Sequence, residues 1–270
     1  MSAPSTESGL PIYQDAARYD AEHWWKTDDL TFWEELTGEY GPRVLELAAG
    51  TGRLALPVLK SRATYTGLEI STAFLECARV KLASFGQRAR LVQGDIRDFH
   101  LDETFDLILI GFNAFLHLLT DEEALAALAC VREHCHEGTR LVIDIFVPDP
   151  LFLYRPEGQR VPAKIYADPQ IGATVKVEET NLYDPDTELN HLRWYYSTDE
   201  KKDFLVINFT LRMYFPDTMD RLLHSAGVLE DGRVVLTQGN LPPLQSVESL
   251  ACDPVLHLVV GKAGGVGDLG

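Results

Sequence analysis

Three carboxylates stand at the ends of three apolar runs in the first hundred residues. Glu46 closes the first run, Glu69 closes the second, and Asp95 follows the third. A carboxylate can accept hydrogen bonds from an ammonium group, from both hydroxyls of a ribose, or from the exocyclic amine of adenine. In an open parallel sheet the carboxyl ends of the strands meet at one edge, where ligands bind. The three side chains therefore predict a nucleoside site in which Glu46 faces a cationic group.

A glycine turn, Ala48–Gly52, follows Glu46. Its glycines let the backbone turn sharply and let a ligand approach the main chain. Gly50–Ala55 also match G-x-G-x-x-A, a form of the dinucleotide fingerprint, so a nicotinamide cofactor is one alternative. Two observations argue against it: Glu46 would repel a pyrophosphate, and Ala48 and Ala49 separate the strand from the first glycine. An ordinary strand-to-helix turn is the other alternative.

His117 follows the fourth apolar run in the segment Gly111–Leu118. A histidine titrates in the range that suits a general base. Asn113, in the same segment, can position an acceptor or the amino-acid end of a cofactor. The alternative interpretation is that His117 is a structural histidine.

Apolar runs alternate with helical patterns through the middle of the chain. The runs that predict strands are 43–47, 64–70, 89–93, 105–110 and 140–146. The segments that predict helices between them are 53–60, 71–85 and 121–137. This alternation predicts an α/β fold, with a parallel sheet and helices joined by right-handed crossovers.

Different patterns flank this region. Residues 13–40 show helical spacing with a helix start near Thr27, and β-branched and aromatic runs at 173–183, 188–196 and 204–215 predict an antiparallel sheet. A helix at 216–226 and strands at 233–238 and 255–260 follow. The predicted organisation is a disordered N-terminus (1–12), a helical lid (13–40), a cofactor-binding α/β core (41–150), an antiparallel insert for acceptor binding (151–215), a C-terminal helix and strands completing the core (216–262), and a flexible tail (263–270).

The composition is that of a soluble globular protein. The 270 residues are 46% hydrophobic and carry a formal net charge of -17, which argues against nucleic acid as a partner. The four cysteines form no CxxC pair and are interpreted as packed thiols. Neither a signal peptide nor a stretch of membrane-spanning length is recognised, so we expect a cytoplasmic protein without a membrane partner. A homodimer is left open.

In order and spacing, four segments resemble class I S-adenosylmethionine-dependent methyltransferases. They are Val-Leu-Glu-Leu-Ala-Ala-Gly-Thr-Gly-Arg, Gly-Leu-Glu-Ile-Ser, Gly-Asp-Ile-Arg-Asp-Phe and Phe-Asp-Leu-Ile-Leu-Ile-Gly-Phe-Asn, within Arg43–Phe146. The chain departs from the family's acid-x-Gly-x-Gly-x-Gly pattern at Ala48. The resemblance implies a Rossmann-like sheet and S-adenosyl-L-methionine as cofactor. It also implies that Glu46 and the turn hold the methionyl part, Glu69 the ribose, and Asp95 with Ile96 the adenine.

Other features resemble the sugar amine N,N-dimethyltransferases of macrolide pathways. These are the Phe-x-x-x-x-His-Leu pattern at Phe112–Leu118, the Tyr19-Asp20 pair with Tyr13 upstream, the late antiparallel insert, and Phe215-Pro216. The resemblance implies that Tyr13, Tyr19 and His117 face donor and acceptor. Glycine N-methyltransferases share the layout more distantly.

An aromatic cluster consists of His23, Trp24, Trp25, Phe32 and Trp33, and it is either core or a lid that excludes water over the cofactor. In the insert, alternation places His191, Arg193 and Tyr195 on one face, which either lines the acceptor pocket or is the solvated side.

The chain is thus predicted to be a methyltransferase that moves a methyl group to a nitrogen or oxygen of a small molecule by in-line displacement, without a metal. The alternatives are a nicotinamide-dependent oxidoreductase and a non-catalytic nucleoside-binding or dimerisation module. The predicted catalytic residues are His117, Tyr13 and Asn113. The predicted cofactor-binding residues are Tyr19, Trp25, Glu46, Ala48, Gly50, Gly52, Arg53, Glu69, Ile70, Asp95, Ile96 and Phe112.

Overall fold

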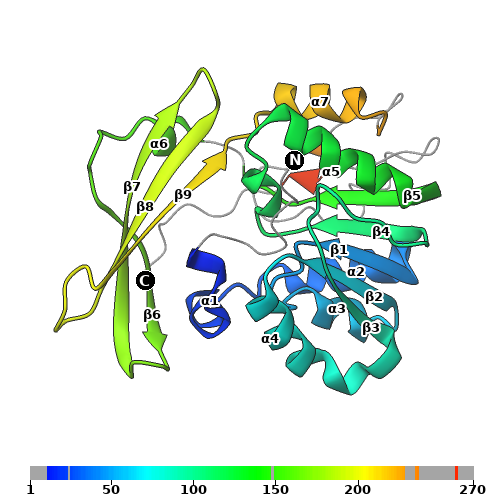
Figure 1. Cartoon of the computed structure of the whole chain (residues 1–270), viewed down its shortest axis with the longest axis horizontal. Helices are drawn as coiled ribbons and strands as arrows, with labels where there is room; N and C mark the ends of the chain where they lie inside the picture. The colour runs from blue at the N-terminus through cyan, green and yellow to red at the C-terminus, as the bar shows by residue number, and fades with distance from the viewer. Residues whose placement is uncertain (1–10, 24, 147–148, 229–234, 237–258, 261–270) are drawn as a thin grey trace, which may run out of the picture.

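A five-stranded parallel sheet and a four-stranded antiparallel sheet stand side by side in the computed structural model (Figure 1). The structure describes residues 11–23, 25–146, 149–228, 235–236 and 259–260. In the parallel sheet the strand order is β3-β2-β1-β4-β5. Its strands are β1 (Arg43–Leu47), β2 (Thr64–Glu69), β3 (Ala89–Gln93), β4 (Phe105–Ile110) and β5 (Cys135–Ile143).

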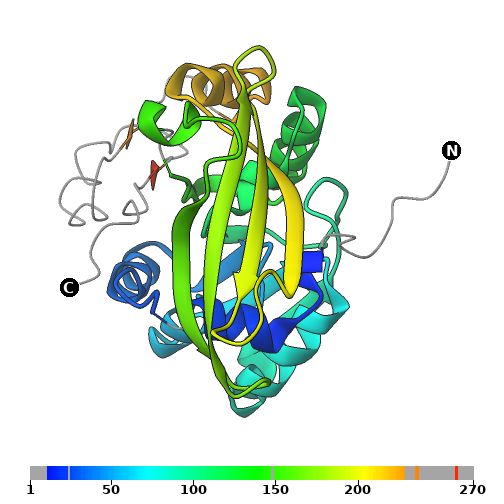
Figure 2. The same ribbon diagram turned by 90° about the vertical axis from the view of Figure 1, so that its left-hand side faces the viewer.

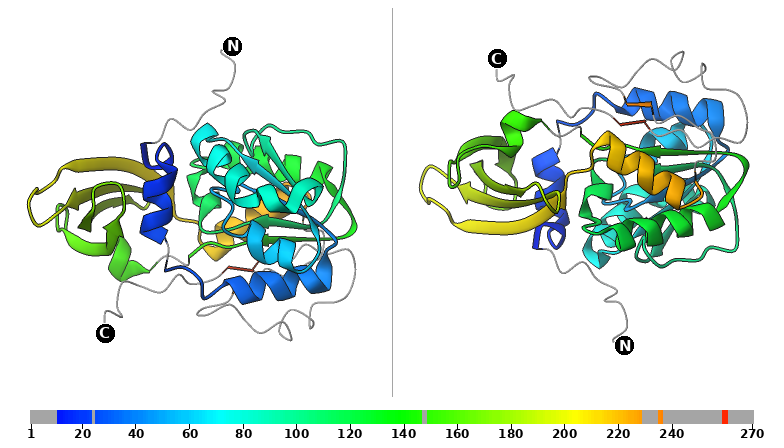
Figure 3. Two further views of the ribbon diagram at one scale, coloured as in Figure 1. Left: turned by 90° about the horizontal axis from the view of Figure 1, so that it is seen from below. Right: turned by 90° about the horizontal axis from the view of Figure 1, so that it is seen from above.

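Helices cover both faces of the parallel sheet, as predicted (Figure 3). One face packs against α2 (Leu30–Tyr40) and α3 (Ala55–Lys60), and the other against α5 (Asp121–Glu133) and α7 (Pro216–Ser225). The helix α4 (Thr72–Leu82) connects β2 to β3. Strands buried between two helical layers need apolar side chains on both faces, which explains the continuous runs in the sequence. The α/β prediction is confirmed.

The region between β5 and α7 forms the antiparallel sheet, whose outer face is seen in Figure 2. Its order follows the chain, with β6 (Val161–Asp168), β7 (Ala173–Asp184), β8 (Leu189–Ser197) and β9 (Leu205–Arg212). Three of these strands were predicted, but β6 was not. Pro162 interrupts its pattern, and a proline is tolerated there because β6 is an edge strand. A short helix, α6 (Pro150–Leu153), precedes it.

The predicted N-terminal helix is in fact two helices, α1 (Ala16–His23) and α2, preceded by the 3-10 turn η1 (Pro11–Tyr13). Ile12 of this turn is buried in the cluster beneath the antiparallel sheet, so the predicted disorder does not extend to it. Figure 1 shows α1 between the antiparallel sheet and the parallel-sheet core. The N-terminal segment therefore bridges the two parts of the molecule.

The helix predicted at 121–137 ends at Glu133, and the next strand begins at Cys135 instead of residue 140. His134 makes this turn: its Nε2 accepts from the Leu101 amide and its Nδ1 donates to the Cys130 carbonyl. Tertiary contacts thus override a local helical pattern.

At the C-terminus, β10 (Val235–Leu236) and β11 (Val259–Val260) pair with each other in parallel, not with the five-stranded sheet. The rest of the two predicted C-terminal strands, residues 1–10 and the predicted flexible tail lie outside the described residues. Within the described part of the chain, every helix falls short of the length and apolarity needed to cross a membrane.

Candidate active site

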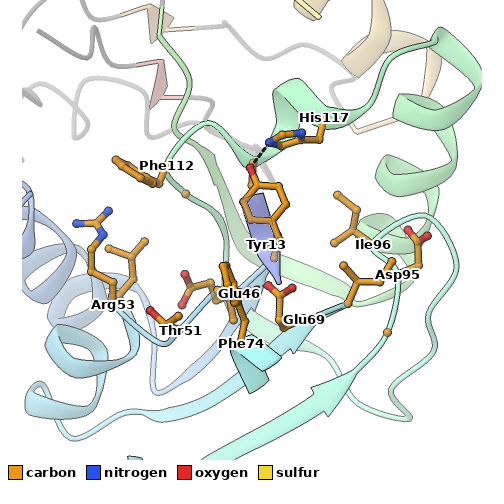
Figure 4. Close-up of a pocket in the computed structure, with 18 of the residues that line it drawn as sticks. Tyr13, Glu46, Thr51, Arg53, Glu69, Phe74, Asp95, Ile96, Phe112 and His117 are labelled. Atoms are coloured by element: carbon orange, nitrogen blue, oxygen red, sulfur yellow. Dashed lines mark hydrogen bonds between the residues drawn. The ribbon is translucent and has the colours of Figure 1, made fainter. Parts of the chain in front are cut away.

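A pocket of about 380 Å³ lies at the carboxyl ends of β1, β2, β3 and β4, beneath residues of η1 and α1. Twelve of the fifteen residues predicted to be catalytic or cofactor-binding line it: Tyr13, Tyr19, Glu46, Ala48, Gly50, Arg53, Glu69, Ile70, Asp95, Ile96, Phe112 and His117. In Figure 4, Arg53 and Phe112 lie at one end, Asp95 and Ile96 at the other, and Glu69 between them. The three carboxylates therefore share one elongated cavity.

Glu46 is a buried carboxyl with one hydrogen bond. The Tyr65 hydroxyl donates to its Oε2 at 2.6 Å, and no second hydrogen bond to this carboxyl is found among the described residues. Burial raises the pKa of Glu46 to about 8, although the Tyr65 hydrogen bond and the charge of Arg53 oppose the rise. An ammonium group placed beside it would supply the missing partner and favour the ionised form. This end of the pocket fits the cationic part of an amino acid.

Glu69 joins the glycine turn to the start of α4. Its Oε2 accepts from the Gly50 amide and its Oε1 from the Ser71 amide, both at 2.8 Å. Burial is the largest influence on Glu69 and raises its pKa, while these amides oppose the rise. Each carboxylate oxygen has a second lone pair, so the group can still accept from ligand hydroxyls.

The glycine turn has left-handed backbone at Ala48 (φ 56°), Gly50 (φ 59°) and Gly52 (φ 85°). Ala48 thus adopts a conformation that favours glycine, which explains why the family pattern has glycine there. Gly52 does not line the pocket: a Cβ atom at this position would lie 3.4 Å from the Ala78 Cβ of α4. The predicted role of Gly52 in cofactor binding is therefore indirect, through the packing of the turn on α4.

Asp95 is held by an arginine that the sequence analysis did not assign. Arg97 donates to both oxygens of Asp95, and its Nη1 also pairs with Glu123 at the start of α5. Both Arg97 and Glu123 line the pocket. The Arg97 ion pair lowers the pKa of Asp95 against the effect of its partial burial. The signal in the sequence was the i, i+2 spacing of Asp95 and Arg97.

Tyr13 and His117 meet in the pocket, although 104 positions separate them in sequence. The Tyr13 hydroxyl lies 2.5 Å from His117 Nε2, shown as a dashed line in Figure 4. Burial lowers the pKa of His117 to about 4 and raises that of Tyr13 well above its ordinary value. At neutral pH the imidazole is therefore uncharged, and the tyrosine hydroxyl keeps its proton.

Two residues predicted to be in the site lie elsewhere. Trp25 is 52% exposed, its indole donates to the Glu22 carbonyl, and it does not line the pocket. Asn113 does not line the pocket either: its side-chain oxygen accepts from the Phe146 amide at 2.7 Å, which ties the loop after β4 to the end of β5. The geometry gives Asn113 a structural role instead of the predicted acceptor-positioning role.

The rest of the aromatic cluster divides between core and pocket. Phe32 and Trp33 are buried in the core beneath α2, whereas His23 lines the pocket with its ring 5.2 Å from that of Phe112. His23 was not among the predicted site residues. Trp24 lies outside the described residues.

A second pocket of about 600 Å³ shares His117 and Leu119 with the first. Its lining includes the predicted acceptor-binding residues His191, Arg193 and Tyr195. The two cavities therefore adjoin at His117, the predicted base.

Alternation along β8 shows which of its side chains face the core. Asn190, Leu192 and Tyr196 are buried, whereas His191 and Arg193 are exposed. The two exposed side chains bond to Thr210 and Asn208 on the neighbouring strand. The predicted trio therefore lines the second pocket from the outward-facing positions of β8. Its role in acceptor binding stays a prediction.

Comparison with known proteins gives a family match in the same region. A family model described as "Methyltransferase domain" matches residues 44–138. The chain is 36% identical over 101 residues to dTDP-3-amino-3,4,6-trideoxy-alpha-D-glucopyranose N,N-dimethyltransferase of Streptomyces venezuelae, and 28% identical over 108 residues to cypemycin N-terminal methyltransferase of a Streptomyces species. These alignments cover 37% and 40% of the chain. The chain spans only 41% and 43% of the length of these relatives.

Solved structures match over most of the chain. The CcbJ methyltransferase of Streptomyces caelestis superposes with a TM-score of 0.66 at 20% identity, covering 83% of this chain and 88% of that one. DesVI of Streptomyces venezuelae gives a TM-score of 0.61 at 22% identity, covering 82% and 93%. At such identities the likeness establishes the fold. Residues 44–138 thus match the methyltransferase domain family, and the chain has the fold of class I S-adenosylmethionine-dependent methyltransferases, with similarity to the sugar N-methyltransferases.

Proposed function

We propose that this protein is an S-adenosylmethionine-dependent methyltransferase that acts on a nitrogen of a small-molecule acceptor. The observation that carries the proposal is the position of the Tyr13–His117 pair, in a pocket lined by three carboxylates and at the junction with a second pocket. A binding module would need no neutral base between two cavities. A nicotinamide cofactor is disfavoured because its pyrophosphate would lie near the buried carboxyl of Glu46.

The order of the lining residues supports this choice of cofactor. Along the pocket in Figure 4 the sequence is Glu46 with Arg53, then Glu69, then Asp95 with Ile96. S-adenosylmethionine has the same order of parts: a charged amino acid, a ribose and an adenine. Glu46 would hold the ammonium, Glu69 the ribose hydroxyls, and Asp95 and Ile96 the adenine. When bound, the cofactor supplies an electrophilic methyl group on a sulfonium.

The chain's own residues would align the acceptor and remove its proton. An amine must lose a proton for its lone pair to attack, and His117 can take that proton because it is neutral well above pH 4. The Tyr13 hydroxyl holds the imidazole by its hydrogen bond to Nε2. The rings of Tyr13, Tyr19 and Phe74 pack together in the wall of the pocket, and their apolar faces would keep water away from the reacting groups.

A nitrogen acceptor is preferred to oxygen because of the relatives. The two relatives described above are named an N,N-dimethyltransferase and an N-terminal methyltransferase. Methylation of a hydroxyl would also need a stronger base than a histidine whose pKa is lowered to about 4. The supported acceptor is therefore an amine on a small molecule, and a sugar amine is the first class to try.

Ligand binding tests the cofactor directly. Calorimetry and thermal unfolding should show that S-adenosylmethionine and S-adenosylhomocysteine bind and stabilise the protein, whereas NAD and NADH do not. Stabilisation by the nicotinamide compounds alone would refute the proposal. A methyl-transfer screen against amines, sugar nucleotides, phenols and carboxylates then identifies the acceptor class.

Replacement of the base tests the mechanism. His117→Ala should lower kcat by about 10²–10⁴-fold, the usual contribution of general acid–base catalysis. Affinity for S-adenosylhomocysteine should change little. His100→Ala is the matched control, because His100 is exposed and pairs with Asp102 outside the pocket. An unchanged kcat in His117→Ala would remove the imidazole from the mechanism.

A further inference from the structure

Two consecutive residues after β4 have left-handed backbone, although neither is glycine. Phe112 has a φ of 52° and Asn113 a φ of 63°. This conformation is uncommon for non-glycine residues and an outlier for a bulky one. Backbone strain of this kind persists only where the surrounding structure holds it, and it gathers at functional sites. The turn between β4 and the 3-10 helix η3 (Ala114–His117) therefore needs contacts that hold it.

This turn places two side chains in the active site. The ring of Phe112 lies in the pocket wall, 4.9 Å from the guanidinium of Arg53 and 5.2 Å from the ring of His23. The helix η3 follows the turn directly and ends at His117, whose Nε2 meets the Tyr13 hydroxyl. Figure 4 shows Phe112 and His117 on opposite sides of Tyr13. A change in the backbone of the turn would therefore move both side chains.

Asp144, the residue after β5, holds the turn by hydrogen bonds. Its Oδ2 accepts from the Phe112 amide at 3.0 Å, and its carbonyl accepts from the Asn113 amide at 2.9 Å. Its own amide donates to the carbonyl of Ile110, the last residue of β4, at 2.8 Å. Both left-handed residues thus have their amides bonded to the same residue at the end of the neighbouring strand.

The Asp144 carboxyl acts on the backbone and not on a ligand, because Asp144 lines neither pocket. In this it differs from the three carboxylates that close β1, β2 and β3. Burial is the largest influence on Asp144 and raises its pKa, while the Phe112 amide opposes the rise. The charged groups that act on it are Asp29, Lys26 and Arg53. Its oxygen is thus committed to the turn before any ligand arrives.

We propose that Asp144 is a positioning residue for methyl transfer, which keeps the left-handed turn at Phe112 and Asn113 and so places His117 beside Tyr13 in the closed part of the pocket. What matters is the accepting oxygen of the side chain and not its charge. The inference rests on the proposed function, since it takes His117 to be the base.

An NMR titration of the His117 imidazole in the free protein measures its placement without an acceptor. In the wild type burial alone lowers its pKa to about 4, although six charged side chains line the same pocket: Glu46, Arg53, Glu69, Asp95, Arg97 and Glu123. In Asp144→Ala the Phe112 amide loses its partner, the turn relaxes and the imidazole reaches water. Its pKa should then rise toward the ordinary histidine value of about 6.5. Asp144→Asn keeps an oxygen that accepts from the amide, so its His117 should titrate as in the wild type.

Kinetics with the best amine of the methyl-transfer screen give a second readout. Asp144→Ala should lower kcat by about 10²-fold, the effect of misplacing a catalytic group by about 1 Å. Asp144→Asn should keep most of the kcat. Asp168→Ala is the matched control: Asp168 also ends a strand and accepts from two turn amides, those of Gln170 and Ile171, but it lies outside both pockets. It should change neither kcat nor the pKa of His117.

Two outcomes would overturn the proposal. One is a wild-type kcat and His117 pKa in Asp144→Ala, and the other is an equal loss in Asp144→Ala and Asp144→Asn, which would assign the effect to the charge. If the wild type methylates no amine, the proposed function fails, while the titration still decides whether Asp144 places His117.

A pair of variants at Asn113 tests the left-handed turn itself and covers a failure of Asp144→Ala to fold. Asn113→Gly and Asn113→Ala both remove the bond to the Phe146 amide, but only glycine adopts left-handed backbone without a steric cost. The glycine variant should keep the pKa of His117 near its wild-type value and retain more kcat. The alanine variant should raise that pKa and lose more kcat. Equal effects of the two would show that the turn does not place His117, and would also overturn the proposal.

Discussion

The buried carboxyl of Glu46 should couple cofactor binding to pH. Its pKa of about 8 means that it holds a proton at neutral pH in the free protein. A bound ammonium favours the ionised form, so binding should release a proton. Because the pKa rises on folding, this group's contribution to the free energy of unfolding decreases as pH rises from the ordinary glutamate value toward 8. In the free protein the ionised form of Glu46 is therefore unfavourable at neutral pH, and a bound ammonium group would stabilise it.

Binding of S-adenosylmethionine should therefore tighten as pH rises from 6 to 8, by about tenfold per unit, and level off above 8. Calorimetry in buffers of different ionisation enthalpy measures the proton released. Glu46→Gln should bind more weakly and lose this pH dependence. A wild-type affinity that stays constant over the same range would contradict the assignment.

Single residues also mark the limit of what the sequence could predict about the site. The carboxylates and His117 follow strands, and the fold brings strand ends together, so their convergence was predictable. Trp25 and Asn113 were assigned from neighbours in sequence, but the break after α1 exposes Trp25, and the left-handed backbone at Asn113 directs its side chain to Phe146. Arg97 pairs locally with Asp95, but it also pairs with Glu123 of α5, a tertiary contact that no local pattern encodes.

At the scale of elements, α1 acts as a cover that is tied to the cofactor turn. Asp20 of α1 accepts from the Thr51 hydroxyl at 2.6 Å and pairs with Lys81 of α4 at 2.5 Å. Tyr19 and His23 of the same helix line the pocket. These contacts hold α1 against the cofactor turn and α4, and their loss should make the cover open more often.

Asp20→Ala should raise the dissociation rate of S-adenosylhomocysteine by about tenfold, the effect of weakening the closed state by ~1.4 kcal/mol. Stopped-flow displacement measures this rate. Glu76→Ala is the control, since Glu76 pairs with Arg79 on the exposed side of α4. Dissociation as slow as in the wild type would show that α1 does not control ligand exit.

The elements themselves were predicted where burial leaves a clear pattern. The parallel strands are continuous apolar runs, and β7, β8 and β9 alternate, so both sheets were recognisable. The missed strand β6 combines an edge position with Pro162, and the early start of β5 is fixed by His134 contacts in three dimensions. The order β3-β2-β1-β4-β5 follows from no residue pattern and comes from the crossovers.

At the scale of the whole molecule, a buried ion pair docks the antiparallel sheet onto α1. Lys164 of β6 lies 3.2 Å from Glu22 Oε2 and 4.1 Å from the centre of the Trp194 ring. Glu22 is 2% exposed and the lysine 14%. Because neither charge is well hydrated, each is stabilised chiefly by the opposite charge of the other.

Lys164→Met should lower the free energy of unfolding by about 3–5 kcal/mol, since it leaves a carboxylate buried without its partner. Adding Glu22→Gln should restore much of this loss. Urea unfolding of the wild type, both single variants and the double variant gives the coupling. Lys176→Met is the control, because its pair with Asp199 is exposed, and it should leave stability unchanged. Additive losses in the double variant would mean that the two residues do not act as a pair.

One side chain, His117, belongs to the walls of both cavities. In the proposed reaction the methyl group passes directly from the cofactor in the first cavity to the acceptor in the second, without a covalent intermediate on the protein. The cofactor and the acceptor must then be bound at the same time, and neither product can leave before both substrates have bound. Initial rates measured at several fixed acceptor concentrations should give reciprocal plots that intersect, whereas parallel lines would require the protein itself to carry the methyl group. The position of His117 in the walls of both cavities thus predicts a sequential kinetic mechanism.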